Sequence, residues 1–363
     1  MAVTLPGIDV SFTQRAASLL ARSERGIAIL IIRDATKTTS FYSFQSYADA
    51  EKSFTDFTSA NQQAITDVYT LAQPYRLCVV RIGTSGTISD ATAIIEANVR
   101  TGWVTVADGT AADFTALITW IGTCESNSKT YKAIVHGVST APDKRHVVNL
   151  INSKITFSDT RGEKSGAAYL PSLLGMLAGA NVTSGVTNAK CANLSGCAAV
   201  SSPDTAVGAG QFVLIQDVDG VYVGVDVNSL TTTNGKTLTE DMKYIETVEA
   251  MDLISDDIRE EFRNTYLGRY KNSLDNQMLF IAAVRGYFAS LAGENILDPD
   301  YENTVDIDVA SQRAAWIATG KSEASEWTDA KVRQMAFKRT VYLTADIKIL
   351  GSMENLKFEI GMA

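Results

Sequence analysis

Histidine and cysteine are the side chains most often used in nucleophilic catalysis and metal binding, and this chain of 363 residues contains few of them. His136 ends an apolar run that is typical of a strand, and we expect His146 on the surface of a helix. The four cysteines are too few for a disulfide framework, and Cys191 and Cys197 lack the CxxC spacing of a redox or zinc pair. The sequence therefore predicts neither a histidine-based active site nor a metal centre.

Two glycine-containing segments imitate phosphate-binding loops. Asn234-Gly-Lys-Thr237 has the end of such a motif, but Leu230 stands where the leading glycine belongs. Gly83-Thr-Ser-Gly86 follows an expected strand and precedes an expected helix, which is a suitable setting for phosphate, but it lacks the G-x-G-x-x-G spacing. We favour an ordinary strand-to-helix loop here, and a nucleotide- or sugar-phosphate-binding α/β enzyme is the alternative.

Acidic residues cluster at two places, and both clusters have simpler explanations than a cation site. Asp217-Val-Asp219-Gly220 lacks the third acidic position and the distal glutamate of a calcium loop, so we expect a hairpin turn. The second cluster is expected on the solvated face of a long helix: Asp256, Asp257, Glu260 and Glu261. The G-x-S-x-G nucleophile turn does not occur in the sequence. The sequence therefore predicts no enzyme and no cofactor.

Composition and charge narrow the class of protein further. A hydrophobic content of 45% and a charged content of 20% are ordinary for a folded soluble protein, and the length predicts two or three domains. The net charge of −9 argues against a nucleic-acid partner, which requires a basic face. No apolar run approaches the ~20 residues needed to span a bilayer. The first residues lack the pattern of a secretory signal peptide, so we expect folding in a cytoplasm.

Strand and helix patterns alternate over the first two thirds of the chain, as in a mostly parallel sheet covered by helices. Residues 26–32 form a continuous apolar run, which is typical of a strand buried on both faces. An apolar run at residues 166–179, interrupted by Pro171, predicts a packed helix, and residues 211–227 predict a hairpin with Asp219-Gly220 at its turn. The remaining elements of this α/β part are expected as strands at 76–82, 103–106 and 131–136, and as helices at 60–71, 90–99, 111–124 and 143–152.

The pattern changes near residue 238, where an α+β part begins. A long amphipathic helix is expected from residue 248 to 266, ended by Gly268. Further helices are expected at 276–291, 310–319 and 329–336, with a short strand at 304–307. The predicted organisation is a multi-domain α/β plus α+β chain, divided into an N-terminal segment 1–22, an α/β domain 23–238, an α+β domain 239–349 and a C-terminal segment 350–363.

Both ends of the chain alternate between apolar and polar residues, which is typical of half-buried strands. The apolar positions are Leu5, Ile8, Val10 and Phe12 near the start, and Leu356, Phe358 and Ile360 near the end. An unpaired strand leaves open N–H and C=O groups that recruit another backbone. The ends either close onto a sheet of their own chain or extend the sheet of a neighbouring chain as arms, and periodicity alone does not choose between these alternatives.

Several segments, taken in order, carry a resemblance to one family. They are Pro6-Gly7-Ile8-Asp9-Val10, residues 168–187 followed by Asn193-Leu194, Val227-Asn-Ser-Leu-Thr-Thr232, Asp252-Leu-Ile-Ser-Asp-Asp-Ile258 with Tyr266-Leu-Gly268 and Asn272, and residues 341–350 with Met353-Glu354 and 356–360. Asp9 stands where an aromatic residue is common, and Arg269 where lysine is usual. The sequence resembles contractile tail sheath proteins of myovirus-type phages and phage-tail-like bacteriocins, particularly the short sheaths of Gram-positive prophages.

The resemblance implies a structural protein that polymerises helically around an inner tube and contracts to drive the tube through a cell envelope. It implies exchange of the terminal arms between neighbouring subunits, an α/β domain on the outside and the C-terminal domain on the tube side. The expected partners are further copies of the chain, the inner tail tube protein, and baseplate and tail-terminator proteins, without nucleic acid or membrane insertion. The alternative within this class is the sheath of a related contractile injection or secretion system.

Tube contacts are expected on the helix at 310–319 or on the basic stretch at 331–339. The residues that we assign to this contact are Arg313, Lys331, Arg333 and Lys338. The resemblance also implies assembly in the cytoplasm of a bacterial host, with the product being a virion or a released phage-tail-like particle.

Overall fold

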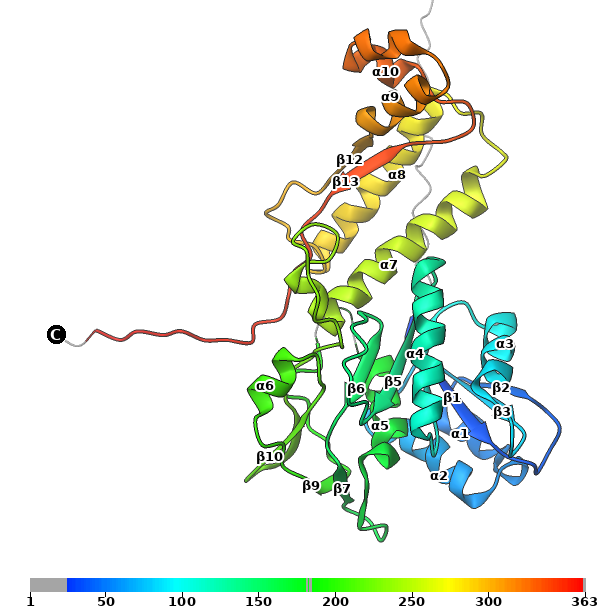
Figure 1. Ribbon diagram of the computed structural model, residues 1–363, viewed down its shortest axis with the longest axis vertical. Coiled ribbons are helices and arrows are strands. Elements are labelled where there is room, and N and C mark those ends of the chain that lie inside the picture. The colour runs from blue at the N-terminus through cyan, green and yellow to red at the C-terminus, as the bar shows by residue number, and fades with distance from the viewer. Residues whose placement is uncertain (1–24, 181, 183–184, 362–363) are drawn as a thin grey trace, which may run out of the picture. The chain divides into compact units, whose positions relative to one another are not determined.

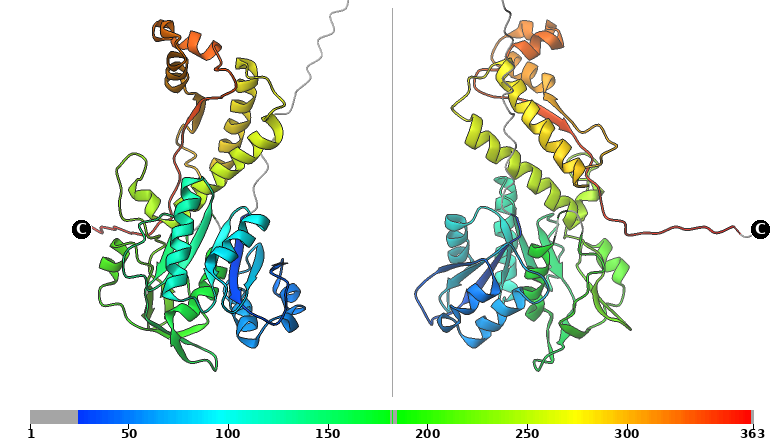
Figure 2. Two further views of the ribbon diagram at one scale, coloured as in Figure 1. Left: turned by 45° about the vertical axis from the view of Figure 1, so that its right-hand side comes forward. Right: turned by 180° about the vertical axis from the view of Figure 1, so that it is seen from behind.

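The structure is a computed structural model that describes residues 25–180, 182 and 185–361. The chain forms two compact units, shown in Figures 1 and 2. The larger unit contains the described residues up to Asp256 together with 349–361, and the smaller unit is Asp257–Lys348. The division falls inside helix α7 (Ile245–Glu261). The domain limits that the sequence predicts at residues 22, 238 and 349 follow changes in sequence pattern, and they stay a prediction.

The larger unit is built on a six-stranded sheet in the order β2-β3-β1-β4-β5-β6. Its strands are parallel, except that β2 pairs antiparallel with β3. The strands are β1 (Ile27–Arg33), β2 (Phe41–Phe44), β3 (Arg76–Ile82), β4 (Gly102–Val106), β5 (Tyr131–His136) and β6 (Val147–Leu150). Residues 27–32 of β1 are all buried, as their continuous apolar run predicts for a strand covered on both faces.

Helices of the larger unit pack against this sheet, and three of them begin at a threonine side-chain cap. The threonines before α3 and α4, Thr87 and Thr110, each form a capping box with an aspartate three residues later. The helices are α1 (Tyr47–Glu51), η1 (Phe54–Asp56), α2 (Ser59–Val68), α3 (Ile88–Asn98), α4 (Ala111–Ser126), η2 (Gly166–Tyr169), α5 (Leu170–Gly179), α6 (Pro203–Gly208) and η3 (Glu240–Lys243). The predicted alternation of strands and helices is confirmed up to β5.

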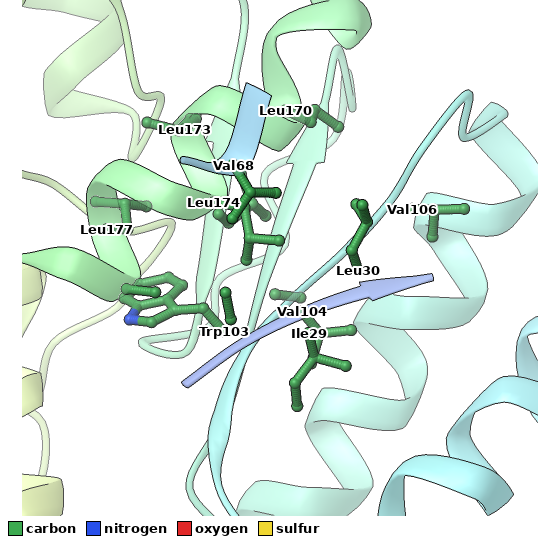
Figure 3. Close-up of a cluster of buried hydrophobic side chains, with 14 of the residues drawn as sticks. Ile29, Leu30, Val68, Trp103, Val104, Val106, Leu170, Leu173, Leu174 and Leu177 are labelled. Atoms are coloured by element: carbon green, nitrogen blue, oxygen red, sulfur yellow. The ribbon is translucent and has the colours of Figure 1, made fainter. Parts of the chain in front are cut away.

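Helix α5 packs against the sheet and against α2, and Figure 3 shows its leucines beside Val68 of α2 and Val104 of β4. Gly175 allows this close approach, because a Cβ there would lie 1.7 Å from the Val68 carbonyl oxygen. Pro171 occupies the first turn, where it costs no helical hydrogen bond. The prediction of a packed helix is confirmed. No helix in the described part of the chain combines the length and apolarity needed to cross a membrane.

Two smaller sheets complete the larger unit, and one of them is the predicted hairpin. Their strands are β7 (Lys154–Phe157), β8 (Glu163–Ser165), β9 (Leu194–Cys197), β10 (Leu214–Asp217) and β11 (Gly220–Val223). The hairpin β10–β11 is confirmed, but its turn lies one residue earlier than predicted, because Asp217 pairs with Gly220. The Asp217 carboxylate accepts the N–H groups of Asp219 and Gly220 at 2.8 and 3.1 Å, which closes the loop.

The smaller unit combines an antiparallel strand pair with helices. Beyond the end of α7 it contains η4 (Phe262–Tyr266), α8 (Leu274–Gly293), β12 (Thr304–Ile307), α9 (Val309–Ala318), η5 (Ser322–Glu326), α10 (Asp329–Gln334) and β13 (Leu343–Asp346). Strands β12 and β13 pair with each other, and α8 contacts β12. The strand predicted at 304–307 and the helices predicted around 276–291, 310–319 and 329–336 are confirmed, with shifted ends.

Two sequence predictions about whole elements are wrong, and the expected position of His146 on a helix surface is wrong together with the first of them. Residues 143–152 do not form a helix. Residues 147–150 instead form β6, a buried strand at the edge of the sheet, and their β-branched valines favour a strand. The acidic residues of α7 do not all face solvent. Asp257 is fully buried and accepts a hydrogen bond from the Tyr287 hydroxyl at 2.6 Å, and Glu261 is also buried. A neighbouring polar side chain therefore outweighed the preference of a carboxylate for water.

Candidate assembly interface and charged clusters

The last described residues, 350–361, form an extended segment that contains neither helix nor strand (Figure 1). Leu356, Phe358 and Ile360 are 88%, 75% and 71% exposed. Exposed apolar side chains that alternate with polar ones are typical of a strand that lacks its partner. A single chain thus forms no strand over these residues, and their pairing in an assembly stays a prediction. The other predicted arm positions, Leu5, Ile8, Val10 and Phe12, lie outside the described residues.

Ser352 fixes the start of this segment on the larger unit. Its N–H and its hydroxyl donate to the two carboxylate oxygens of Glu246 at 2.7 and 2.6 Å. The Gly185 N–H donates to the Ser352 hydroxyl at 3.3 Å, and the Thr187 hydroxyl donates to the Glu354 carboxylate at 2.6 Å. The segment is therefore held as far as Glu354, and the residues that follow are exposed.

The strand pair β12–β13 is covered unevenly, with β13 more exposed than β12. Three of the four residues of β13 are exposed, whereas Val305 and Ile307 of β12 are buried. The Arg285 guanidinium of α8 donates to the Val305 carbonyl at 3.0 Å and covers part of β12. Because this sheet has two strands within the described residues, it offers edges at which a further strand can pair.

The four basic residues assigned to tube contact differ in their surroundings. The Arg313 side chain is occupied within the smaller unit, where it donates to the Ala324 carbonyl at 3.0 Å and pairs with Asp329 at 2.6 Å. Arg333 pairs with Asp306 at 2.5 Å. Lys331 and Lys338 are exposed. The structure thus leaves the two lysines more accessible to a partner than the two arginines, and the contact itself stays a prediction.

The prediction that His146 lies on a helix surface is wrong. The residue directly precedes β6 and is 2% exposed. Its Nδ1 lies 2.8 Å from the Glu125 carboxylate of α4, and its Nε2 lies 3.1 Å from the Asp252 carboxylate of α7. Lys132 of β5 pairs with Asp252 at 2.8 Å and with Glu249 at 3.2 Å. We name these residues the mixed-charge cluster.

The electrostatics of the mixed-charge cluster favour charged forms. Burial opposes ionisation of Lys132, but the carboxylates of Asp252 and Glu249 outweigh it and raise the lysine pKa. Burial likewise opposes protonation of His146, but Asp252 and Glu125 outweigh it and raise the histidine pKa. The cluster ties α7 to β5 and α4. An adjoining cavity lined by Trp103, Lys132 and Glu249 measures about 10 Å³, which is room for one water molecule and not for a substrate.

Sequence reasoning missed this cluster although two signals pointed to it. Lys132 interrupts the apolar run of β5, and Asp252 lies four residues after buried Val248, on the apolar side of α7. A charge in such a position needs a partner of opposite sign. The partners are distant in the sequence, with His146 and Asp252 separated by 106 residues, so the sequence alone did not pair them.

Side chains of the chain itself already accept donors at both phosphate-loop candidates. The Asn234 side-chain oxygen accepts the backbone N–H groups of residues 236, 237 and 238 at 2.9 to 3.0 Å. At the start of α3, the Asp90 carboxylate already accepts the N–H and the hydroxyl of Thr87. An ordinary loop therefore accounts for the segment from Gly83 to Gly86, and the nucleotide-binding alternative gains no support.

The cysteines and carboxylates of the described residues do not form a metal centre or a reactive thiol pair. Within the part of the chain that the structure describes, no group of three or more His, Cys, Asp or Glu side chains is arranged to hold a metal ion. Burial raises the pKa of the Cys191 thiol to about 11, and burial also raises the pKa of Cys197. Both thiols are therefore protonated and unreactive near neutral pH.

Comparison with known proteins connects these features to one family. Residues 237–363 match the family described as the phage tail sheath C-terminal domain. The chain is also 23% identical to the tail sheath protein of Clostridium phage phiCD119 over 368 residues, which cover 99% of both chains. The resemblance to tail sheath proteins is confirmed. The family match contains β12, β13 and the exposed segment 350–361.

Solved sheath structures share the fold of this sheath-like chain. The sheath tail protein of Desulfitobacterium hafniense matches with a TM-score of 0.68 and 13% identity, covering 83% of this chain and 94% of that one. The helical sheath of the anti-feeding prophage in its contracted state matches with a TM-score of 0.69 and 13% identity, covering 99% of both chains. The predicted mixed α/β fold with parallel and antiparallel sheets is confirmed by these likenesses. The matched proteins are structural sheath components and not enzymes.

Proposed function

We propose that this chain is the subunit of a contractile sheath, which polymerises helically around an inner tube and contracts to drive that tube through a cell envelope. The observation that carries the proposal is the exposed alternating segment 350–361, which lies within the match to the tail sheath C-terminal domain. The overall likeness to sheath proteins supports it. The implied product is a virion or a phage-tail-like particle, assembled in the cytoplasm of a bacterial host, and a sheath of a related injection system is the alternative.

The proposed joint between subunits is an exchanged strand. The segment 356–360 would pair with the sheet of a neighbouring chain, and residues 1–12 would add a second arm. Each backbone hydrogen bond formed in this way contributes roughly 1 kcal/mol net. Burial of Leu356, Phe358 and Ile360 contributes roughly 1.5–3 kcal/mol apiece before the cost of ordering the arm. Such a joint binds strongly while its flanking loops allow the subunits to rotate.

Contraction is proposed as a change between two lattices of the same joined subunits. The free energy comes from the difference between their inter-subunit contacts, so no nucleotide is required. The proposed partners are further copies of this chain, the inner tube protein, and baseplate and tail-terminator proteins. Lys331 and Lys338 are the most accessible of the predicted tube contacts, and Arg313 and Arg333 form ion pairs within the smaller unit.

Electron microscopy of the purified chain tests this function. We expect the full chain, alone or mixed with its tube protein, to form helical tubes of regular diameter. Particles that remain monomeric at every concentration and with the tube protein present would contradict the proposal. A thermal-shift screen with nucleotides should show no stabilisation, because the loop from Gly83 to Gly86 lacks the G-x-G-x-x-G spacing and the Asp90 carboxylate caps the helix that follows it.

A further inference from the structure

Three carboxylates meet where the C-terminal segment is held on the larger unit, and we name Asp226, Glu246 and Glu354 the acidic cluster. Asp226 is 2% exposed, and its Oδ1 is buried without a hydrogen-bond partner among the described residues. Its Oδ2 accepts the Glu246 N–H at 3.3 Å. A Cβ on Gly185 would lie 2.5 Å from Asp226 Oδ2 and 3.1 Å from Glu246 Oε2, so these two carboxylates flank the same backbone position.

One hydroxyl joins the backbone of Asp226 to the C-terminal segment. Thr187 accepts the Asp226 N–H at 2.9 Å and donates its own proton to Glu354 at 2.6 Å. Ser352 meanwhile donates twice to Glu246. Docking of residues 351–354 therefore adds a third negative charge beside two that are already close together.

The part of the chain that the structure describes places no paired cation on the acidic cluster. Among the described residues no ion pair reaches any of its three carboxylates, and residues 185–188 are uncharged. On the adjoining η3, Lys243 pairs with Glu240 at 2.6 Å, and Tyr244 contributes only a phenol, whose pKa burial and the nearby Glu354 raise. Burial and the Glu246 carboxylate raise the pKa of Asp226 to about 7, and Glu354 adds to that rise.

We propose that the acidic cluster is a proton-dependent anchor, which holds residues 351–354 when Asp226 is neutral and loosens them when Asp226 is ionised. The proposal rests on the proposed function for its consequence, because the anchor sets the point at which the inter-subunit arm leaves its own chain. An anchored arm has a fixed origin and a shorter reach, and a loosened arm can reach further. The anchor itself is a property of a single subunit.

The sign of the pH dependence follows from linkage. Docking brings Glu354 to Asp226 and raises the pKa of Asp226 above its value in the undocked state, so docking takes up protons. Docking is therefore strongest at acidic pH and weakens as the pH rises towards about 7. Above that pH Asp226 is ionised in both states, and docking no longer changes.

Hydrogen exchange of the full chain tests the anchor. The backbone N–H of Ser352 is the reporter, because it donates to Glu246 in the docked state. We expect its protection, corrected for the intrinsic exchange rate, to fall between pH 5 and pH 7.5 by roughly tenfold for each pKa unit that docking adds to Asp226. In Asp226→Asn the protection should stay at the acidic value throughout. In Glu354→Gln the pH dependence should shrink, and in the control Glu359→Gln, whose residue is exposed on the same segment, it should match the wild type.

The outcomes separate the anchor from the sheath function. Protection that is independent of pH in the wild type, or that falls equally in Asp226→Asn, overturns the anchor even where tubes form. If Asp226→Asn fails to fold, the wild-type titration and Glu354→Gln still decide the matter, because Glu354 lies on the segment and not in the core. A pH-dependent anchor in a chain that never forms tubes would leave the inference standing and refute the proposed function.

Discussion

Two parts of this chain share an alternating strand pattern and have opposite environments. In β12–β13 each strand supplies the hydrogen-bond partner of the other, and Val305 and Ile307 are buried beneath them. In residues 356–360 the same alternation has no partner strand in the described chain, and its apolar side chains face solvent. Alternation of apolar and polar residues therefore predicts that a segment can form a strand, but it does not predict which chain supplies the partner strand.

The largest expected effect comes from removing the unpartnered segment. Deletion of residues 350–363 should abolish tube formation, because the proposed joint between subunits is lost. The deletion should leave the cooperative thermal unfolding of the subunit in place, since residues 356–360 bury no apolar side chain in it. Sedimentation measures assembly and calorimetry measures unfolding. Normal tubes from the truncated chain would contradict the proposal that the C-terminal segment pairs with a neighbouring subunit.

A matched pair of alanine substitutions sharpens the comparison. Ile307→Ala creates a cavity under β12 and should lower the free energy of unfolding by about 2–5 kcal/mol. Leu356→Ala should change it by less than about 0.5 kcal/mol, because the side chain is exposed in the single subunit. Chemical denaturation of the unassembled subunits measures both. A large loss of unfolding free energy in Leu356→Ala would show that the segment packs against its own subunit.

Charge substitutions on the apolar and polar faces of residues 356–360 test whether only one face of the segment is buried in the assembly, as a paired strand requires. Phe358→Asp should weaken tube assembly by roughly 10- to 100-fold in critical concentration, because it removes roughly 1.5–3 kcal/mol of apolar burial. Lys357→Glu alters the polar face of the same segment and should have a much smaller effect. Equal losses in the two variants would contradict an alternating, strand-like contact.

The smallest effect concerns the mixed-charge cluster and its dependence on pH. Because its carboxylate partners raise the pKa of His146, the protonated ring stabilises the fold fully below its unfolded pKa of about 6.5. This stability is lost as the pH rises through the higher folded pKa, at about 1.4 kcal/mol for each unit of the shift. Titration of the unfolding free energy should show this fall in the wild type and not in His146→Gln.

The sequence predicted the elements whose signals are local. The apolar run of β1 and the capping threonines of α3 and α4 lie within the segments that they define, so their structure followed from pattern. The helix predicted over β6 is wrong because the pairing of this segment with β5 and its burial depend on distant parts of the chain, and its two valines alone did not indicate a strand. Tertiary context decided that segment.

The candidate sites were predicted unevenly for the same reason. The exposed apolar residues of the C-terminal segment were visible in the alternation, although their partner was not. The pairing of His146 with Asp252, and of Glu246 with Ser352, joins residues separated by 106 positions in each case. Such pairs become visible only when the fold brings their elements together, so neither charged cluster could be assembled from the sequence.

The central claim is that the C-terminal segment is completed by another copy of this chain. A high-resolution reconstruction of assembled tubes tests it most directly, because it traces residues 350–361 from one subunit to their hydrogen-bond partners. The account predicts that residues 356–360 form a strand in the sheet of a neighbouring subunit. A segment that pairs with its own chain, or that remains unpaired on the tube surface, would contradict it.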